Sequence, residues 1–579
     1  MPSAKSDQPE RSRAAPGAFA VRLALAAAAF VAGCFPILES DLFWHLASGR
    51  WMVEQGAIPR RDPFRFTPPE LPWIDHEWLF QLAAWGIERL AGLDGLIVAR
   101  ATALALFALL LFALARRAGL GPALAGLVAL GGLLGARPRF LFRPEIVTLF
   151  ALLLLLAGLG RWIEQRRPAI LGGLALLVVV WVNFHGQALL APAVAGLFLL
   201  GARGAGARLA LREILVPPLL FAGCLLANPY GWRLIEVPLG ILGALADLPA
   251  ANPEWLSSFA APQPYLYGGF AVVATLAWAA RRSSGRWPAP EWGLPTLGLA
   301  LLALAGVRHQ ALFFAVATPF AAHALAALPE ASGGPPLRER RLVAATLLLT
   351  LAAGAWAAFP PASGPLRPRH GGLGFGFGIA RDRFPVRLAE SLAGRPEVGP
   401  LYNDLVHGGY LIWRLHPPRR VFLDGRMELH PALLHDIAAA RASNTGWDAL
   451  LARYGAVGAL VGYDPRLRPL VEADAAGALR VVGQRTAASL LFPAERYDLV
   501  AWDDAGMLFL ADGAAGWPEA PYRFVQPEDP GWTLRRAAAD PAFRAGALAE
   551  VERKLAEQPD CRRAGELAAR LRALALPRE

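Results

Sequence analysis

The chain has 579 residues, of which 55% are hydrophobic and only 18% are charged, and its mean hydropathy is +0.38. Soluble proteins are about one quarter charged, so this composition excludes a wholly soluble chain. The net charge of +11 does not indicate a nucleic-acid partner, because the excess arginine lies mostly between apolar segments, where membrane topology requires it. The three cysteines predict neither a disulfide framework nor a metal-binding spacing.

Apolar segments near the roughly 20 residues needed to cross a bilayer recur in the first part of the chain. The first of them is followed by no small-residue cleavage site, which favours an uncleaved span over a signal peptide. We predict eleven spans, at 18–38, 94–115, 119–136, 144–160, 168–184, 187–202, 212–228, 264–280, 292–306, 309–327 and 341–358. The predicted domains are a membrane domain at 1–360 with a large first outer loop at 39–93, an α/β domain at 370–515 and a charged helical tail at 516–579.

The arginines between the spans predict the orientation. Five alternate connections carry 14 of them: Arg116, Arg117, Arg161, Arg166, Arg167, Arg203, Arg208, Arg212, Arg281, Arg282, Arg286, Arg338, Arg340 and Arg341. Because positive residues stay on the cytoplasmic side, we expect a cytoplasmic N-terminus and an extracytoplasmic C-terminal domain. The motifs NFHGQ, NPYGW, NPEW and VRHQ then all fall at outer ends of spans.

The first outer loop predicts two amphipathic helices along the outer interface, one after Asp41 and one around Trp78–Ile87. Glu39 and Asp41 stand where the first span leaves the membrane. A carboxylate there can act as a general base, and Asp41 is the stronger candidate. The alternative is that Ser40 or Asp41 only caps the following helix.

A second polar group in the same loop contains His45, Asp75, His76 and Glu77. Asp41 and His45 are four residues apart and therefore share a helical face. Carboxylates and imidazoles can bind a divalent metal, although the sequence requires no cofactor and leaves the metal open. The alternative is a polar face whose members hydrogen-bond one another.

Four arginines stand against the charge rule at predicted outer ends: Arg137, Arg139, Arg143 and Arg308. A guanidinium grips a phosphate with two parallel hydrogen bonds, so this group predicts a phosphate site. The alternatives are snorkelling to the interface and pairing with Glu145. His185 and His309 lie at similar depth as supporting candidates.

The predicted α/β domain has strands at 400–405, 419–426, 456–464, 479–484 and 497–511. Asn403, Asp404, Asp424 and Arg426 lie at strand ends, where they are candidates for the acceptor side of a site or simple loop caps. The glycine-rich stretch 370–378 lacks a preceding strand, and we interpret it as a linker.

An acidic pair after the first span, an outer loop with two interfacial helices and an outer C-terminal domain together resemble the GT-C superfamily of membrane glycosyltransferases. The relatives concerned are the protein O-mannosyltransferase and aminoarabinose transferase group, and DLFWHLASGRWMVEQGAIPRRDPF, NFHGQ and NPYGW look closer to an uncharacterised bacterial branch. The resemblance implies that a sugar moves, with inversion, from a polyprenyl-phosphate carrier to an acceptor hydroxyl of a glycan, lipid or protein at the outer face of the bacterial inner membrane. It places the base at Asp41 with Glu39 as its companion, although the usual pair is adjacent and Ser40 separates these two.

Two other functions remain open from the sequence. A transporter of lipid-linked glycans would carry ionisable residues near the middle of the bilayer, whereas here they lie at the outer ends. A catalytically silent membrane scaffold that keeps the fold is the second alternative.

Overall fold

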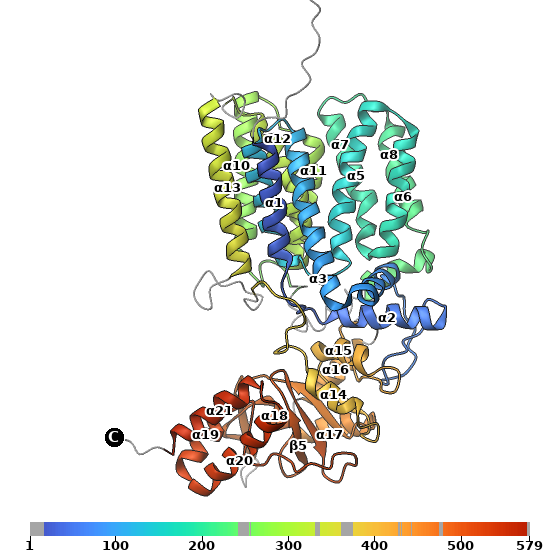
Figure 1. Ribbon diagram of the computed structural model, residues 1–579. Coiled ribbons are helices and arrows are strands. Elements are labelled where there is room, and N and C mark those ends of the chain that lie inside the picture. The colour runs from blue at the N-terminus through green and yellow to red at the C-terminus, as the bar shows by residue number, and fades with distance from the viewer. Residues whose placement is uncertain are drawn as a thin grey trace, which may run out of the picture.

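The computed structural model describes residues 17–240, 254, 256–329, 336–359, 374–426, 429, 431–441, 443–473 and 479–575. Part of the NPEW motif, the first residues of the predicted linker at 370–378 and the end of the charged tail lie outside these residues. Figure 1 shows two layers, a set of roughly parallel helices and, beyond one end of them, a smaller unit of strands and helices.

The parallel helices come from the apolar part of the sequence. They are α1 (Ala18–Gly33), α3 (Trp78–Arg117), α4 (Pro122–Ala136), α5 (Glu145–Gln165), α6 (Pro168–Phe184), α7 (Ala191–Gly204), α8 (Leu211–Cys224), α10 (Pro264–Ser284), α11 (Pro290–Ala305), α12 (Gln310–Ala326) and α13 (Pro336–Ala358). Short 3₁₀ turns join some of them, namely η1 (Arg137–Arg139), η2 (Gly186–Leu190), η3 (Gly231–Ile235) and η5 (Val307–His309).

Several of these helices are long and apolar enough to cross a bilayer. Within the described ranges, four stretches meet that test by length and composition, Trp78–Arg117, Glu145–Gln165, Gly186–Gly204 and Arg338–Ala358, and α1 and α6 are shorter apolar helices. The protein is therefore a multi-pass membrane protein, and the count of eleven spans stays a prediction.

The arginine-rich connections meet at one end of the helices. Arg117 pairs with Glu164 across 3.0 Å, and Arg166 pairs with Glu213 across 2.7 Å. The polar motifs lie at the other end, next to the strand-containing unit (Figure 1). The arginine-rich connections and the polar motifs therefore lie at opposite ends of the helices, and the orientation stays a prediction.

Two helices of the first loop lie at the polar end. Helix α2 (Asp41–Gln55) runs across the ends of the parallel helices (Figure 1). Helix α3 is interrupted at Gly92, whose φ of 66° is left-handed, a conformation that glycine adopts without a Cβ penalty. The kink separates an N-terminal part, which begins at Trp78, from the apolar part that follows.

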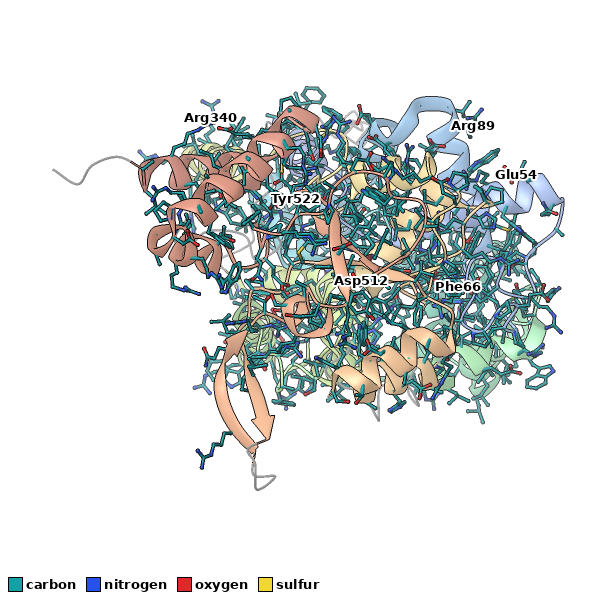
Figure 2. The ribbon with its side chains drawn as sticks, turned by 90° about the horizontal axis from the view of Figure 1, so that it is seen from below. Glu54, Phe66, Arg89, Arg340, Asp512 and Tyr522 are labelled. Atoms are coloured by element: carbon teal, nitrogen blue, oxygen red, sulfur yellow. The ribbon has the colours of Figure 1, made fainter. Side chains whose placement is uncertain are left out.

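The strand-containing unit has a four-stranded sheet in the order β1 (Leu401–Asn403), β2 (Gly458–Gly462), β6 (Gly506–Ala511), β5 (Tyr497–Trp502). The β1–β2 pair is parallel, and the other two pairs are antiparallel. Its helices are α14 (Val386–Ala393), α15 (Leu405–Leu415), α16 (Pro431–Ala440), α17 (Asn444–Arg453), α18 (Ala487–Leu491), α19 (Pro530–Ala539), α20 (Pro541–Glu557) and α21 (Arg562–Ala573). A separate hairpin, β3 (Arg468–Ala473) and β4 (Leu479–Arg485), projects from the rest, as Figure 2 shows.

A shared core joins the two layers. Phe43 of α2 packs edge-on against Tyr410 of α15, with ring centroids 4.9 Å apart, and the backbone of Phe66 donates to the carbonyl of Val421 at 3.1 Å. The α/β unit is thereby fixed against the start of α2, which positions the site described next.

Candidate active site

The acidic pair Glu39 and Asp41 lies at the junction of the two layers, and its members have different surroundings. The Glu39 side chain is fully buried and pairs with Arg100 at 3.5 Å, and it accepts a hydrogen bond from the backbone of Phe142 at 2.7 Å. The Asp41 side chain is 29% exposed and pairs with Arg143 at 3.1 Å. Only Asp41 can therefore meet a molecule that approaches from water.

Asp41 stands where α2 meets the loop around Gly425. It is the first residue of α2, the preceding Ser40 makes no side-chain cap bond, and a Cβ added to Gly425 would meet the Asp41 Oδ1 atom at 2.5 Å. The strand predicted at 419–426 is wrong, because these residues form only an isolated bridge between Val421 and Arg65. The loop around Gly425 instead lies against the carboxylate. The absence of a Cβ at position 425 leaves room for this close approach.

Two of the predicted arginines converge on one carboxylate that the site prediction had left out. Arg139 pairs with Glu254 at 2.9 Å, and Arg143 pairs with it at 3.2 Å. Burial alone would raise the pKa of Glu254, but the guanidinium groups of Arg143 and Arg139 lower it well below its ordinary value. Two guanidinium groups thus converge on one oxygen atom, Oε2 of Glu254.

The four arginines of the predicted phosphate site also make contacts that differ from one another. Arg139 also pairs with Glu145 at 2.8 Å, so the pairing alternative is present together with the cluster. Arg308 lies on η5 beside His309 and interacts electrostatically with Glu145 and Glu254. The Arg137 guanidinium instead lies 4.9 Å from the ring centre of Trp356, a cation–π contact.

Three imidazoles surround Glu77. The Nε2 atoms of His45, His76 and His185 lie 3.8, 3.6 and 3.7 Å from its carboxylate oxygens. Burial, and next the charge of Arg143, lower the pKa of His45 well below its ordinary value. His45 Nε2 thus faces Glu77, whereas Asp41 of the same helix pairs with Arg143.

The residues predicted at strand ends have mainly internal partners. The Asn403 amide donates to the Leu423 carbonyl at 2.7 Å. Asp424 accepts from Arg65 at 2.8 Å and from Arg426 at 2.7 Å, and Arg426 also pairs with Asp62 at 3.0 Å. Burial would raise the pKa of Asp424, but Arg426 and Arg65 lower it well below its ordinary value. These buried ions join the first loop to the α/β unit.

Asp404 is placed differently, because it remains at a surface. It accepts from the backbone of Gly462 at 2.7 Å, pairs with Arg441 at 3.4 Å and lines a cavity of about 280 Å³ within the α/β unit. Its contacts lie within that unit. We therefore separate it from the Asp41 cluster.

Comparison with known proteins gives matches at the level of structure. No family model matches the chain, and no curated protein matches it. The structure is similar to the oligosaccharyltransferase of Archaeoglobus fulgidus in the apo form, with a TM-score of 0.52 and 12% identity over 77% of this chain and 69% of that one. It is also similar to ArnT from Cupriavidus metallidurans in the apo state, with a TM-score of 0.51 and 14% identity over 86% of this chain and 98% of that one.

Both of these proteins are GT-C glycosyltransferases. The chain has a GT-C-like fold. The resemblance predicted from the acidic pair and the outer loop is thereby confirmed for the fold. At these identities the likeness does not extend to substrates or catalytic residues, which are treated below as proposals.

The GT-C-like core offers no ready metal site in the part of the chain that the structure describes. No group of three or more His, Cys, Asp or Glu side chains there is arranged to hold a metal ion. Asp41 pairs with Arg143, and His45, His76 and His185 face the single carboxylate of Glu77. The metal-binding and hydrogen-bonding interpretations of this group both stay predictions, and the mechanism proposed below depends on neither.

Asp75 gives a prediction about the pH dependence of stability. Burial raises its pKa to about 8, against a smaller opposing effect from the Gln81 amide, which donates to Asp75 at 2.5 Å. Between about pH 4 and pH 8 the folded protein keeps a proton that the unfolded chain releases, so this group makes the fold less stable as pH rises. We expect Asp75→Asn to raise the melting temperature by a few degrees at pH 9 and to change it little at pH 5.

Thermal melts of the purified parent and variant at the two pH values measure this difference. Asp512→Asn, at an exposed residue (Figure 2), is the matched control and should show no such divergence. An Asp75→Asn variant whose effect is the same at both pH values contradicts the assigned protonation.

The sequence missed three site residues for different reasons. Glu254 belongs to the NPEW motif that had been placed at the outer end, but nothing in the motif indicated a partner. Arg100 could have been identified from the sequence, because an arginine within the predicted span 94–115 requires a buried partner. In the structure that partner is Glu39. Arg65 pairs with a residue 359 positions away, which no local pattern indicates.

Proposed function

We propose that the protein is a glycosyltransferase that moves a sugar from a polyprenyl-phosphate carrier to an acceptor hydroxyl at the outer face of the bacterial inner membrane. The observation that carries the proposal is the contact between Asp41, a half-exposed carboxylate, and Arg143, a member of the arginine cluster. A base and a phosphate grip thus lie in direct contact, at the polar end of a GT-C-like set of helices.

The proposed step needs one base and one stabilised leaving group. Asp41 takes the proton from the acceptor hydroxyl, whose oxygen attacks the anomeric carbon on the face opposite the phosphate. The bond between that carbon and the phosphate oxygen breaks, the configuration inverts, and the polyprenyl phosphate leaves with the electron pair. Arg139 and Arg143 stabilise the negative charge that develops on the leaving phosphate.

Glu254 has a defined part in this proposal. It occupies the two guanidinium groups before the donor arrives, so the lipid phosphate must displace it. The exchange keeps the arginines paired in both states, which avoids leaving buried charges uncompensated. Glu39 and Arg100 hold the backbone around Asp41 and Phe142 in place.

The proposal is tested in cells by the fate of the donor. A strain that lacks the protein should accumulate a polyprenyl-phosphate-linked sugar in its lipid extract, and expression of the parent chain should remove it. A lipid extract that is unchanged by deletion of the gene contradicts a transferase function.

Orientation is a separate expected result. The arginine-rich end should face the cytoplasm, so a periplasmic phosphatase joined between α13 and α14 should be active, and one joined near Arg166 should be silent. Whole-cell phosphatase activity, normalised to the amount of fusion protein, measures both. The reverse pattern would place the Asp41 site in the cytoplasm and rule out an outer-face reaction.

A further inference from the structure

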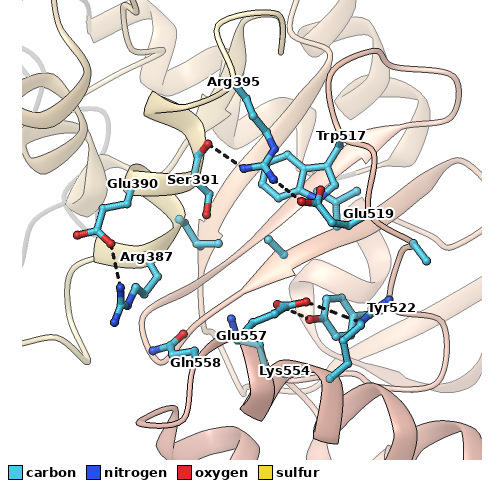
Figure 3. A pocket seen from close by; sticks show the side chains of 15 residues that line it. Arg387, Glu390, Ser391, Arg395, Trp517, Glu519, Tyr522, Lys554, Glu557 and Gln558 are labelled. Carbon is cyan, nitrogen blue, oxygen red and sulfur yellow. Dashed lines mark hydrogen bonds and ion pairs between the residues drawn. The ribbon is translucent and has the colours of Figure 1, made fainter.

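A polar pocket in the α/β unit lies apart from the Asp41 cluster. It has a volume of about 340 Å³, which is within the range of small-molecule sites. Residues of α14, of β5, of the segment around Trp517–Tyr522 and of α20 line it, as Figure 3 shows. The mechanism proposed above uses none of these residues.

Charges of both signs alternate around the wall. Arg387 pairs with Glu390 at 3.3 Å, Arg395 pairs with Glu519, and Tyr522 donates to Glu557 at 3.2 Å. Each carboxylate keeps further lone pairs, and each guanidinium keeps further N–H groups. Four cationic side chains, Arg387, Arg395, Arg553 and Lys554, and three carboxylates line the pocket. Because the two signs nearly balance, the wall suits a neutral ligand that both donates and accepts hydrogen bonds.

The pocket lining also includes a buried donor, Lys554, and a buried acceptor, Gln558. Lys554 and Gln558 line the pocket with only 5% and 8% of their surface exposed. The Gln558 Oε1 atom is buried and has no hydrogen-bond partner among the described residues, and leaving such an acceptor unsatisfied costs free energy. Figure 3 labels both at the pocket, Lys554 in the last turn of α20 and Gln558 directly after that helix.

An aromatic side chain forms part of the wall. Trp517 lies at the pocket with the Arg395 guanidinium 4.2 Å from the centre of its ring. An indole ring supplies apolar area that complements the C–H face of a sugar. The hydroxyl groups of a sugar both donate and accept hydrogen bonds.

We propose that this pocket binds a neutral saccharide, with hydroxyl groups hydrogen-bonded to Lys554, Gln558 and the paired charges. The pocket holds the acceptor glycan through sugar units away from the reacting hydroxyl. This role in acceptor binding rests on the proposed transferase function. Saccharide binding itself requires no lipid donor.

The test uses the full chain in nanodiscs that are free of sugar-headed detergent. Saturation-transfer NMR is recorded with maltose, cellobiose, lactose, mannobiose and chitobiose in turn. We expect saturable transfer to at least one of these disaccharides. Gln558→Leu should weaken that binding about tenfold, as loss of one buried hydrogen bond does, without lowering the melting temperature, because it removes an unsatisfied acceptor.

Arg387→Gln and Arg453→Gln are a matched pair. Both arginines are at least half exposed and paired with a carboxylate of the same unit, but only Arg387 lines the pocket, so only its variant should bind the disaccharide more weakly. This comparison decides the question even if Gln558→Leu fails to fold. Absence of transfer to every disaccharide, or equal binding by Arg387→Gln and Arg453→Gln, overturns the proposal.

The two proposals fail separately. The NMR measurement contains no donor and therefore tests the pocket whether or not sugar transfer is demonstrated. Accumulation of the lipid-linked sugar in a deletion strain tests the transferase whether or not the pocket binds a saccharide.

Discussion

Replacing Asp41 by asparagine should lower the turnover of sugar transfer by about 10²–10⁴-fold, the usual contribution of a positioned base. Asparagine keeps the size of the side chain and can still accept a hydrogen bond from Arg143, but it cannot take a proton from the acceptor. Membrane insertion and donor binding should stay close to those of the parent. The measurement is the rate at which the variant removes accumulated lipid-linked sugar from a deletion strain, at matched protein levels.

Two variants place this result in context. Glu39→Gln should lower thermal stability more than turnover, because Glu39 is buried against Arg100 and the Phe142 backbone. Asp540→Asn is the matched control, since Asp540 also stands at the start of a helix and caps α20, where asparagine caps equally well. If Asp41→Asn works like the parent while Glu39→Gln is inactive, the base is Glu39. If both work like the parent, the catalytic role of this loop is wrong.

Replacing Arg143 by lysine should weaken binding of the lipid phosphate about tenfold. Lysine keeps the charge but lacks the planar fork that gives two parallel hydrogen bonds. Arg139→Lys should act in the same direction. Binding of radiolabelled polyprenyl phosphate to the protein in nanodiscs, followed by scintillation proximity, measures the affinity directly.

Two further variants are expected to bind the lipid phosphate more tightly or equally well. Glu254→Gln removes the anion that occupies Arg139 and Arg143, so it should tighten binding of the lipid phosphate. Arg137→Lys should leave binding unchanged, because Arg137 contacts Trp356 and lies outside the Glu254 cluster. Unchanged binding in the lysine variants of Arg139, Arg143 and Arg308 together would show that the phosphate is held elsewhere.

The fold was predictable where the sequence signal is local. A 3.6-residue pattern or an apolar run indicates a helix without reference to the rest of the chain, and the helices α4, α5 and α6 fall on predicted segments. The strands β2, β5 and β6 carry the same kind of local signal. The kink at Gly92 separates the predicted interfacial helix from the predicted span, as a glycine between the two patterns allows.

The site was predictable as a list of residues but not as a set of contacts. The charge rule identified Arg137, Arg139 and Arg143 as exceptional, yet it could not distinguish the two that contact Glu254 from the one that contacts Trp356. Asp424 and Arg426 appeared as acceptor-side candidates, whereas they are buried with Asp62 and Arg65. Partners that are hundreds of residues apart meet only through the packing of the α/β unit on the first loop.

We propose that the arginines beside Asp41, Arg139 and Arg143, hold a polyprenyl-phosphate-linked sugar. Mass spectrometry of the lipid that co-purifies with Asp41→Asn, extracted from nanodiscs, tests it most directly, because this variant should bind the donor without consuming it. We expect a polyprenyl-phosphate sugar with Asp41→Asn and much less of it when Arg143→Lys is added. Recovery of bulk phospholipid alone from both proteins would show that the arginine cluster does not hold the donor.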